Sequence, residues 1–127
     1  MQLRADIYSL SCVLFAFSSL HASAADADGA KLFKNHCGTC HTLDSTAPKR
    51  QGPHLAGLLQ RKAGSLPDFK YSPGLKAAGW QWTPEQLDLW LTDPKALVPG
   101  TSMSVYKQKD PAKRKLIIDY LKTDPKP

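Results

Sequence analysis

The sequence contains little cysteine and methionine and no long hydrophobic run. It has three cysteines and two methionines in 127 residues, and only Cys37 and Cys40 lie beyond the N-terminal apolar segment, which excludes a fold held by several disulfides. The apolar stretch at residues 7–20 is too short and too rich in serine to span a bilayer, which takes about 20 predominantly apolar residues. Repeats, low-complexity tracts and strand patterns of useful length are also absent, so the sequence predicts a small all-α domain.

The first 24 residues have the features of a secretory signal peptide. Arg4 supplies the charged start, the apolar stretch follows, and Ala22-Ser23-Ala24 matches an A-x-A cleavage site. We therefore predict a cleaved signal at residues 1–24 and one domain at residues 25–127, exported to the periplasm as a soluble protein. The alternative is an uncleaved signal that serves as a membrane anchor.

Basic side chains outnumber acidic ones, with 17 Lys and Arg against 11 Asp and Glu and a formal net charge of +6. A basic protein can bind nucleic acid, but the export signal and the lack of any nucleic-acid motif argue against that partner. An acidic protein partner or an anionic surface suits the charge better. We expect a monomer without stable membrane insertion.

Residues Cys37-Gly38-Thr39-Cys40-His41 form the C-x-x-C-H pattern of covalent c-type haem attachment. In that chemistry each cysteine forms a thioether with a haem vinyl group, and the histidine becomes an axial ligand of the iron. A thioredoxin-like dithiol would need a β-α-β context that the sequence lacks. A zinc site with His54 as fourth ligand would depart from the two separated ligand pairs usual for zinc. We therefore predict one haem c, bound through Cys37 and Cys40, with His41 as an iron ligand.

Three helices are expected around this motif. The first runs from Asp26 into the motif, the second starts at Thr83, where Pro84 and Gln86 complete a capping pattern, and the third starts at Asp110. Residues 42–66 carry many turn residues and are expected to form an ordered loop layer. The core-spaced positions of the first and third helices are Leu32, Phe33, His36, Leu116, Ile117, Tyr120 and Leu121.

Met103 is the one methionine beyond the signal segment, and it lies in a turn-rich loop at residues 98–103. A methionine usually fills a hydrophobic core. A lone methionine on a loop has little helix core to fill, and a His/Met pair is a standard axial set in cytochromes c. We therefore predict that Met103 is the second iron ligand, and that His36 and His54 are not ligands.

Taken together, these segments resemble a class I cytochrome c of the mitochondrial type and its bacterial periplasmic relatives. The resemblance runs from Gly29 to Leu121, and it implies a small cytochrome c fold with three main helices and ordered loops wrapped around one covalent haem. Few of its segments are specific alone, whereas their joint order is. They are Gly29 with Phe33, Cys37 to His41, Gly52-Pro53-His54-Leu55, Arg61-Lys62-Ala63-Gly64, Tyr71, Trp82, Pro94-Lys95, Pro99 to Met103 and Tyr120-Leu121.

The resemblance also implies roles for single residues. The carbonyl of Pro53 would accept the hydrogen bond from the ring N–H of the ligand histidine, fixing its orientation. Tyr71 and Trp82 would hydrogen-bond a buried haem propionate, and Arg61 would help to neutralise it. The first and last helices would cross at Gly29, Phe33, Ile117 and Tyr120.

On the methionine side, Trp90 stands where the family often has a tyrosine near the sulfur, and Thr101 would form hydrogen bonds inside the pocket. Three positions depart from the family pattern. Leu75 replaces an asparagine tied to an internal water, Val105 replaces an aromatic residue near the haem edge, and Lys107 replaces a glycine. These departures concern the internal water network, the reduction potential and the docking surface rather than the iron ligands.

With both axial positions filled and no acid–base or nucleophilic pair beside them, the iron would have no substrate site. The sequence therefore predicts a carrier of single electrons in a respiratory chain rather than an enzyme. Two alternatives are a haem subunit of a dehydrogenase or oxidase complex and a haem protein that reacts with a small gas or peroxide. Lysines that would surround the haem edge and attract acidic redox partners are Lys34, Lys49, Lys62, Lys95 and Lys107.

Overall fold

The computed structural model describes residues 24–125, and within that range the regular structure is helical, with no strand. The predicted all-α class is therefore confirmed. The predicted signal peptide lies outside the described residues except for Ala24, where the first helix begins. The elements are α1 (Ala24–His36), a 3₁₀ turn η1 (Leu58–Gln60), α2 (Pro73–Ala77), α3 (Pro84–Thr92), α4 (Pro94–Leu97) and α5 (Pro111–Lys122).

The helix starts follow local capping chemistry. The Thr83 hydroxyl accepts a hydrogen bond from the Gln86 amide at 3.1 Å, and an Asp110 carboxylate oxygen accepts one from the Ala112 amide at 2.9 Å. These side chains satisfy amides that have no partner within the helix. The predicted starts of α3 and α5 are therefore confirmed, and α1 begins two residues before the predicted Asp26.

Two short helices were not predicted as such. In α2, Ser72 is the cap and Pro73 the first residue, but five residues are too few to show a helical period. Asp93 caps α4 in the same way, accepting from the Ala96 amide at 3.1 Å. A cap followed directly by proline is thus the start signal of four helices in this chain.

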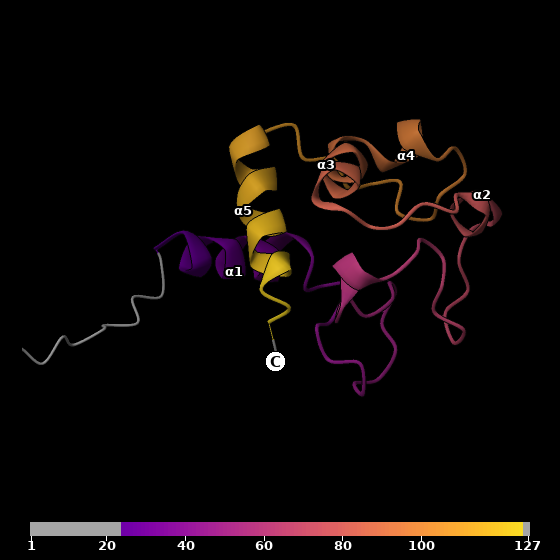
Figure 1. Ribbon diagram of the computed structural model, residues 1–127, viewed down its shortest axis with the longest axis horizontal. Helices are drawn as coiled ribbons and strands as arrows, with labels where there is room; N and C mark the ends of the chain where they lie inside the picture. Colours follow the sequence, from indigo (N-terminus) through magenta and orange to yellow (C-terminus); the bar gives the residue numbers. More distant parts are fainter. Residues whose placement is uncertain (1–23, 126–127) are drawn as a thin grey trace, which may run out of the picture.

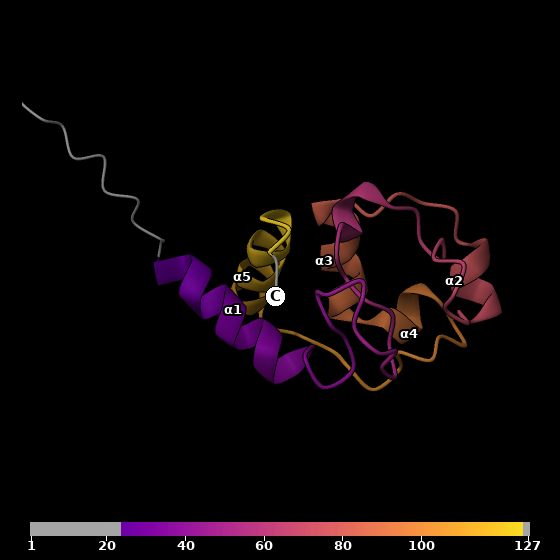
Figure 2. The ribbon, with the colours of Figure 1, turned by 90° about the horizontal axis from the view of Figure 1, so that it is seen from below.

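Helices α1 and α5 cross in close contact, as both ribbon views show (Figures 1 and 2). A Cβ atom built on Gly29 would lie 2.6 Å from the Leu116 carbonyl oxygen and 2.8 Å from Tyr120 Cβ, so only glycine permits this approach. The Phe33 and Tyr120 rings lie 5.7 Å apart, and Ile117 is fully buried beside them. The predicted crossing of the first and last helices is therefore observed.

Helical spacing placed His36 with the core positions, although it was also expected to be a surface or satisfied polar residue. It is exposed at the last residue of α1, with its ring 6.1 Å from that of Tyr106, so the core placement is wrong and the surface placement is confirmed. At a helix end the side chain can reach solvent, where an imidazole avoids the cost of burying a polar group.

The remaining chain lies to one side of the α1/α5 pair, where residues 37–72 and helices α2, α3 and α4 surround a common interior (Figure 2). Leu58 is buried there, and Leu55 and Leu59 pack against the core. The loops are tied to one another by backbone hydrogen bonds, such as Leu55 to Thr42 at 2.7 Å. The predicted ordered loop layer is therefore observed.

Candidate haem-binding site

A cavity of about 220 Å³ lies in this interior, between the loops and helices α3 and α5. All nine residues that the sequence singled out line it, although they come from six separate places in the chain. The cavity thus brings together the whole predicted set. The nine residues are Cys37, Cys40, His41, Pro53, Arg61, Tyr71, Trp82, Thr101 and Met103.

The C-x-x-C-H residues form a turn that continues α1. The Cys37 amide donates to the Phe33 carbonyl at 2.8 Å, and the His41 amide donates to the Cys37 carbonyl at 2.9 Å. Cys37 and Cys40 are free thiols that both face the cavity. Burial, with a smaller contribution from Cys40, raises the pKa of Cys37 to about 12. The Cys37 thiol is therefore protonated at neutral pH, which slows its oxidation because the thiolate is the reactive form.

The His41 ring is held from two sides. Its Nδ1–H donates to the Pro53 carbonyl oxygen at 2.8 Å, which leaves Nε2 as the nitrogen with a free lone pair. Burial lowers the pKa of His41, outweighing the opposite effect of the Pro53 hydrogen bond. A Cβ atom on Gly52 would lie 2.6 Å from Nδ1 and 2.9 Å from Nε2, so the ring rests directly on this glycine. The result is a neutral, oriented imidazole, which is the form that binds a metal.

Two further residues support the same turn and were not predicted. The Arg50 guanidinium donates to the Gly38 carbonyl and, at 3.3 Å, to the His41 carbonyl. The Cys40 thiol donates to Gln51 Oε1 at 3.3 Å. Arg50 contacts backbone carbonyls and Gln51 contacts a thiol that is 11 positions away in the sequence. No local sequence pattern marks either contact.

Two hydrogen bonds hold Met103 in place. The Trp90 indole Nε1–H donates to the Met103 sulfur at 3.3 Å. The Thr101 hydroxyl, which is buried, accepts from the Met103 amide at 3.4 Å. The thioether therefore has a defined position at the cavity, with one side chain on its sulfur and another on its backbone.

A polar corner of the cavity contains Arg61, Tyr71 and Trp82. Arg61 Nη2 donates to the His54 carbonyl at 3.0 Å, whereas Nη1 is buried with no hydrogen-bond partner among residues 24–125. Burial lowers the pKa of Arg61 and raises the pKa of Tyr71. A buried donor on a charged group costs free energy unless an acceptor reaches it, so this corner suits an anionic ligand group.

These features fit a covalent haem c. The two thiols suit the vinyl groups, His41 and Met103 suit the iron, and the orphaned Arg61 N–H suits a propionate. The rest of the wall is apolar and would contact the porphyrin faces. Its members include Leu55, Leu58, Leu75, Leu87, Leu91, Ile117 and Leu121.

A sequence model of the family described as cytochrome c matches residues 27–124. The chain belongs to the cytochrome c family. It is 42% identical over 96 residues to cytochrome c of Theileria annulata and 39% identical over 94 residues to cytochrome c of Ginkgo biloba. These alignments cover 76% and 74% of this chain and 83% of each relative. Family membership carries with it covalently bound haem c and a role in electron transfer.

A bacterial relative is similar to the same degree. The chain is 41% identical over 98 residues to the cytochrome c-type protein cyt cy of Rhodobacter capsulatus, and the alignment covers 77% of this chain. It covers 48% of the relative, so this cytochrome c spans about half the length of that protein. No helix within residues 24–125 is both long enough and apolar enough to cross a bilayer.

The structure shows where the three residues that depart from the family pattern, Leu75, Val105 and Lys107, lie. Leu75 is buried and adds an apolar side chain to the cavity wall of this cytochrome c. Val105 is 95% exposed at the rim of the cavity, and its half-buried neighbour Tyr106 also lines the cavity. Lys107 forms an ion pair with Asp93 at 2.7 Å. Sequence reasoning missed Tyr106, because an inward and an outward residue cannot be told apart on an irregular loop.

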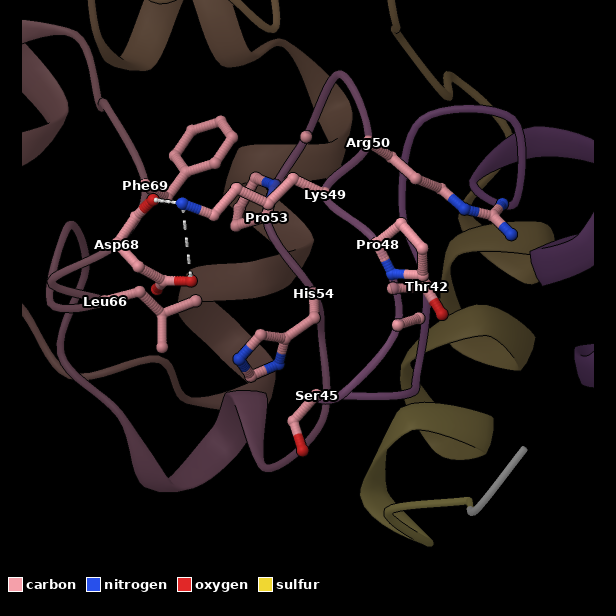
Figure 3. A pocket seen from close by; sticks show the side chains of 12 residues that line it. Thr42, Ser45, Pro48, Lys49, Arg50, Pro53, His54, Leu66, Asp68 and Phe69 are labelled. Carbon is pink, nitrogen blue, oxygen red and sulfur yellow. Dashed lines mark hydrogen bonds and ion pairs between the residues drawn. The ribbon is translucent and has the colours of Figure 1, made fainter.

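His54, the fourth ligand of the zinc interpretation, does not line the cavity of the C-x-x-C-H residues. Within residues 24–125 no three His, Cys, Asp or Glu side chains gather to hold a metal ion. His54 instead lines a separate small cavity of about 30 Å³, together with Lys49 and Asp68 (Figure 3). Lys49 Nζ donates to the Asp68 carbonyl there at 2.8 Å. That volume is enough for about one water molecule. Such a water would give a hydrogen-bond partner to the buried His54 Nδ1, which has none among the described residues.

Proposed function

We propose that this cytochrome c is a soluble periplasmic electron carrier with one haem, whose iron is bound by His41 and Met103. One observation carries the proposal. An imidazole fixed by Pro53 and a thioether fixed by Trp90 line the same apolar cavity as the two C-x-x-C-H thiols. The bound haem would supply reversible one-electron chemistry by cycling between Fe(II) and Fe(III).

The side chains of the site support such a carrier in several ways. The hydrogen bond to Pro53 keeps His41 in the tautomer that presents Nε2, and the contacts of Trp90 and Thr101 keep Met103 in place. Ligands that are already oriented need to move little when the iron changes charge. Arg61 would balance the charge of a propionate in a corner where water is largely excluded.

The expected partners are redox proteins with acidic docking surfaces. Among the predicted lysines, Lys34, Lys62 and Lys95 are exposed and form no ion pair within residues 24–125. Lys49 and Lys107 are engaged by Asp68 and Asp93, which reduces their contribution. The formal charge of +6 favours attraction of acidic partners. Electron-transfer rates with such a partner should therefore fall as ionic strength rises, and rates independent of salt would contradict this docking mode.

The periplasmic location rests on the signal-like segment at residues 1–24 and on the similarity to a bacterial cytochrome c. N-terminal sequencing or intact mass of the protein purified from the periplasmic fraction tests it. A mature chain that starts near Ala25 is expected. A chain that keeps its first residues and sediments with membranes would support an uncleaved anchor instead.

The iron ligands are tested by the optical spectrum of the dithionite-reduced protein with and without carbon monoxide. Sharp c-type bands that the gas does not shift are expected for a closed His41/Met103 iron. The Met103→Ala variant is the matched positive control, because it opens the site and should bind the gas. A wild-type spectrum that shifts in the same way would refute Met103 ligation and favour a gas- or peroxide-reactive protein. Stable co-purification with a dehydrogenase or oxidase would point to a complex subunit.

A further inference from the structure

The three tryptophans of this chain form a continuous row that ends at Met103. The rings of Trp80 and Trp82 lie 5.9 Å apart with an interplanar angle of 80°, and those of Trp82 and Trp90 lie 5.6 Å apart at 72°. The row continues through the 3.3 Å hydrogen bond from Trp90 to the Met103 sulfur. Edge-to-face contacts at these separations are direct ring contacts. No other aromatic contact within residues 24–125 extends beyond a single pair.

The row leads from the core toward the surface. Trp90 and Trp82 are 5% and 7% exposed, whereas Trp80 is half-buried. Trp80 does not line the haem cavity, and it is the member of the row nearest to solvent.

The backbone fixes the order of the rings. The Ala63 amide donates to the Trp80 carbonyl and the Trp82 amide donates to the Arg61 carbonyl, each at 2.9 Å. These bonds form an isolated antiparallel bridge that holds the Trp80–Trp82 segment against residues 61–63. Trp90 is part of α3 and is held by the helix. Fixed contacts of this kind give a defined route for an electron, which loose side chains do not.

We propose that Trp90, Trp82 and Trp80 form an electron path by which reduced haem repairs an oxidised indole at Trp80. The inference rests on the proposed function, because it requires a reducible haem in the cavity that Trp82 and Trp90 line. A one-electron radical oxidant removes one electron from Trp80 and leaves an indole radical cation. One electron would then pass from the reduced haem to Trp82, which lines the haem cavity together with Trp90 and Met103, and on to Trp80, which restores the indole and leaves the iron oxidised. No bond forms or breaks in the transfer.

The surroundings of Trp80 favour this direction. Its Nε1–H is buried and has no hydrogen-bond partner among the described residues, so no side chain or carbonyl is placed to remove the proton from the radical cation. The radical cation is a stronger oxidant than the neutral radical that would follow proton loss. The electron therefore moves outward along the row to Trp80. The iron is oxidised in place of Trp80, and it can be reduced again.

Pulse radiolysis with azide radicals tests the path in the purified holoprotein. In the ferrous protein we expect the indole radical absorbance to decay together with the loss of the ferrous band, at a rate independent of protein concentration. In the ferric protein, which has no electron to supply, the radical should last several-fold longer. Peptide mass spectrometry should then find more oxidised Trp80 in the ferric than in the ferrous sample.

Variants locate the route. Trp82→Phe interrupts the row and should slow the internal transfer several-fold, whereas Phe69→Leu removes an aromatic side chain outside the row and should leave the rate unchanged. Trp80→Phe should abolish the early radical. An indole radical that decays equally fast in ferrous Trp82→Phe and wild type, or equally fast in both oxidation states of the wild type, would overturn the path. The ferrous–ferric comparison needs no variant, so it decides the question even if Trp82→Phe fails to fold.

The test is separable from that of the proposed function. A reduced spectrum unmoved by carbon monoxide, combined with radical decay that ignores the iron, would leave the electron carrier intact and remove the tryptophan path. A spectrum shifted by the gas would refute Met103 ligation in the proposed function, whereas the contact of Trp82 with the cavity would remain and the radical decay would still decide the path.

Discussion

The crossing of α1 and α5 depends on one position without a side chain, and Gly29→Ala tests that dependence. The substitution adds a single methyl group. At an exposed helix position the same change would stabilise the protein by about 1 kcal/mol, because alanine has the higher helix propensity. At Gly29 the new methyl would meet the Leu116 carbonyl oxygen at 2.6 Å and Tyr120 Cβ at 2.8 Å.

These contacts are too close to be relieved by a side-chain rotation. One involves backbone and the other a Cβ atom, so the two helices must separate. Overpacking typically costs about 1–3 kcal/mol, and we expect the upper part of that range, about 2–3 kcal/mol, because neither contact can rotate away. After the gain in helix propensity, the net loss should be about 1–2 kcal/mol, which corresponds to a fall in Tm of roughly 5–10 °C for a domain of this size.

Thermal and guanidinium unfolding of the holoprotein, followed by circular dichroism, measures this loss. Asn35→Ala is the matched control, since it is exposed in the same helix and should leave stability unchanged or slightly higher. A Gly29→Ala protein as stable as the Asn35→Ala protein would show that the helices do not approach as closely as described, and the reasoning would fail.

Three further outcomes follow from the site and its loops. Arg61→Met should lower the reduction potential by roughly 30–60 mV, because removal of a buried cation favours the ferric state. Protein-film voltammetry measures this change, and an unchanged potential would exclude Arg61 from the haem environment. Burial and then Arg61 lower the pKa of His54, so the folded state binds its proton less readily and the unfolding free energy should fall as pH drops below about 6.5. His54→Asn should flatten that slope, and an unchanged slope would refute this assignment. Asp124→Ala removes the acceptor of the 2.7 Å hydrogen bond from the Gly57 amide and should lower the unfolding free energy by about 1 kcal/mol in the same assay. An unchanged unfolding free energy would show that this hydrogen bond does not stabilise the fold.

The sequence predicted the long helices because their signals are local. A cap at Thr83 or Asp110, followed by proline, fixes a helix start through hydrogen bonds only two or three residues away. The helix α2 was missed because five residues cannot display a period, and the helical pattern alone placed the exposed His36 with the core because it does not show where the neighbouring helix ends.

The sequence predicted which residues line the candidate site, but it did not predict every contact that holds the C-x-x-C-H turn. Chemistry restricts thioether formation and iron ligation to a few residue types, so Cys37, His41 and Met103 could be singled out from type and spacing. Arg50 and Gly52 act on the same turn through a carbonyl contact and through the lack of a side chain. Any basic residue or any glycine would give the same sequence signal, and only the folded loop shows which one is used.

The supports also explain how one set of residues can serve both the fold and the iron. Arg61 joins two loops by its bond to the His54 carbonyl and also lines the cavity, with its second terminal nitrogen buried and without a hydrogen-bond partner among residues 24–125. Trp90 belongs to the buried face of α3 while its indole N–H holds the Met103 sulfur. Because the same atoms join the loops and orient the ligands, binding of haem to the folded chain must add to its stability, and the free energy of that binding is shared with folding. The ligand geometry is then as rigid as the fold itself, which is what an electron carrier requires.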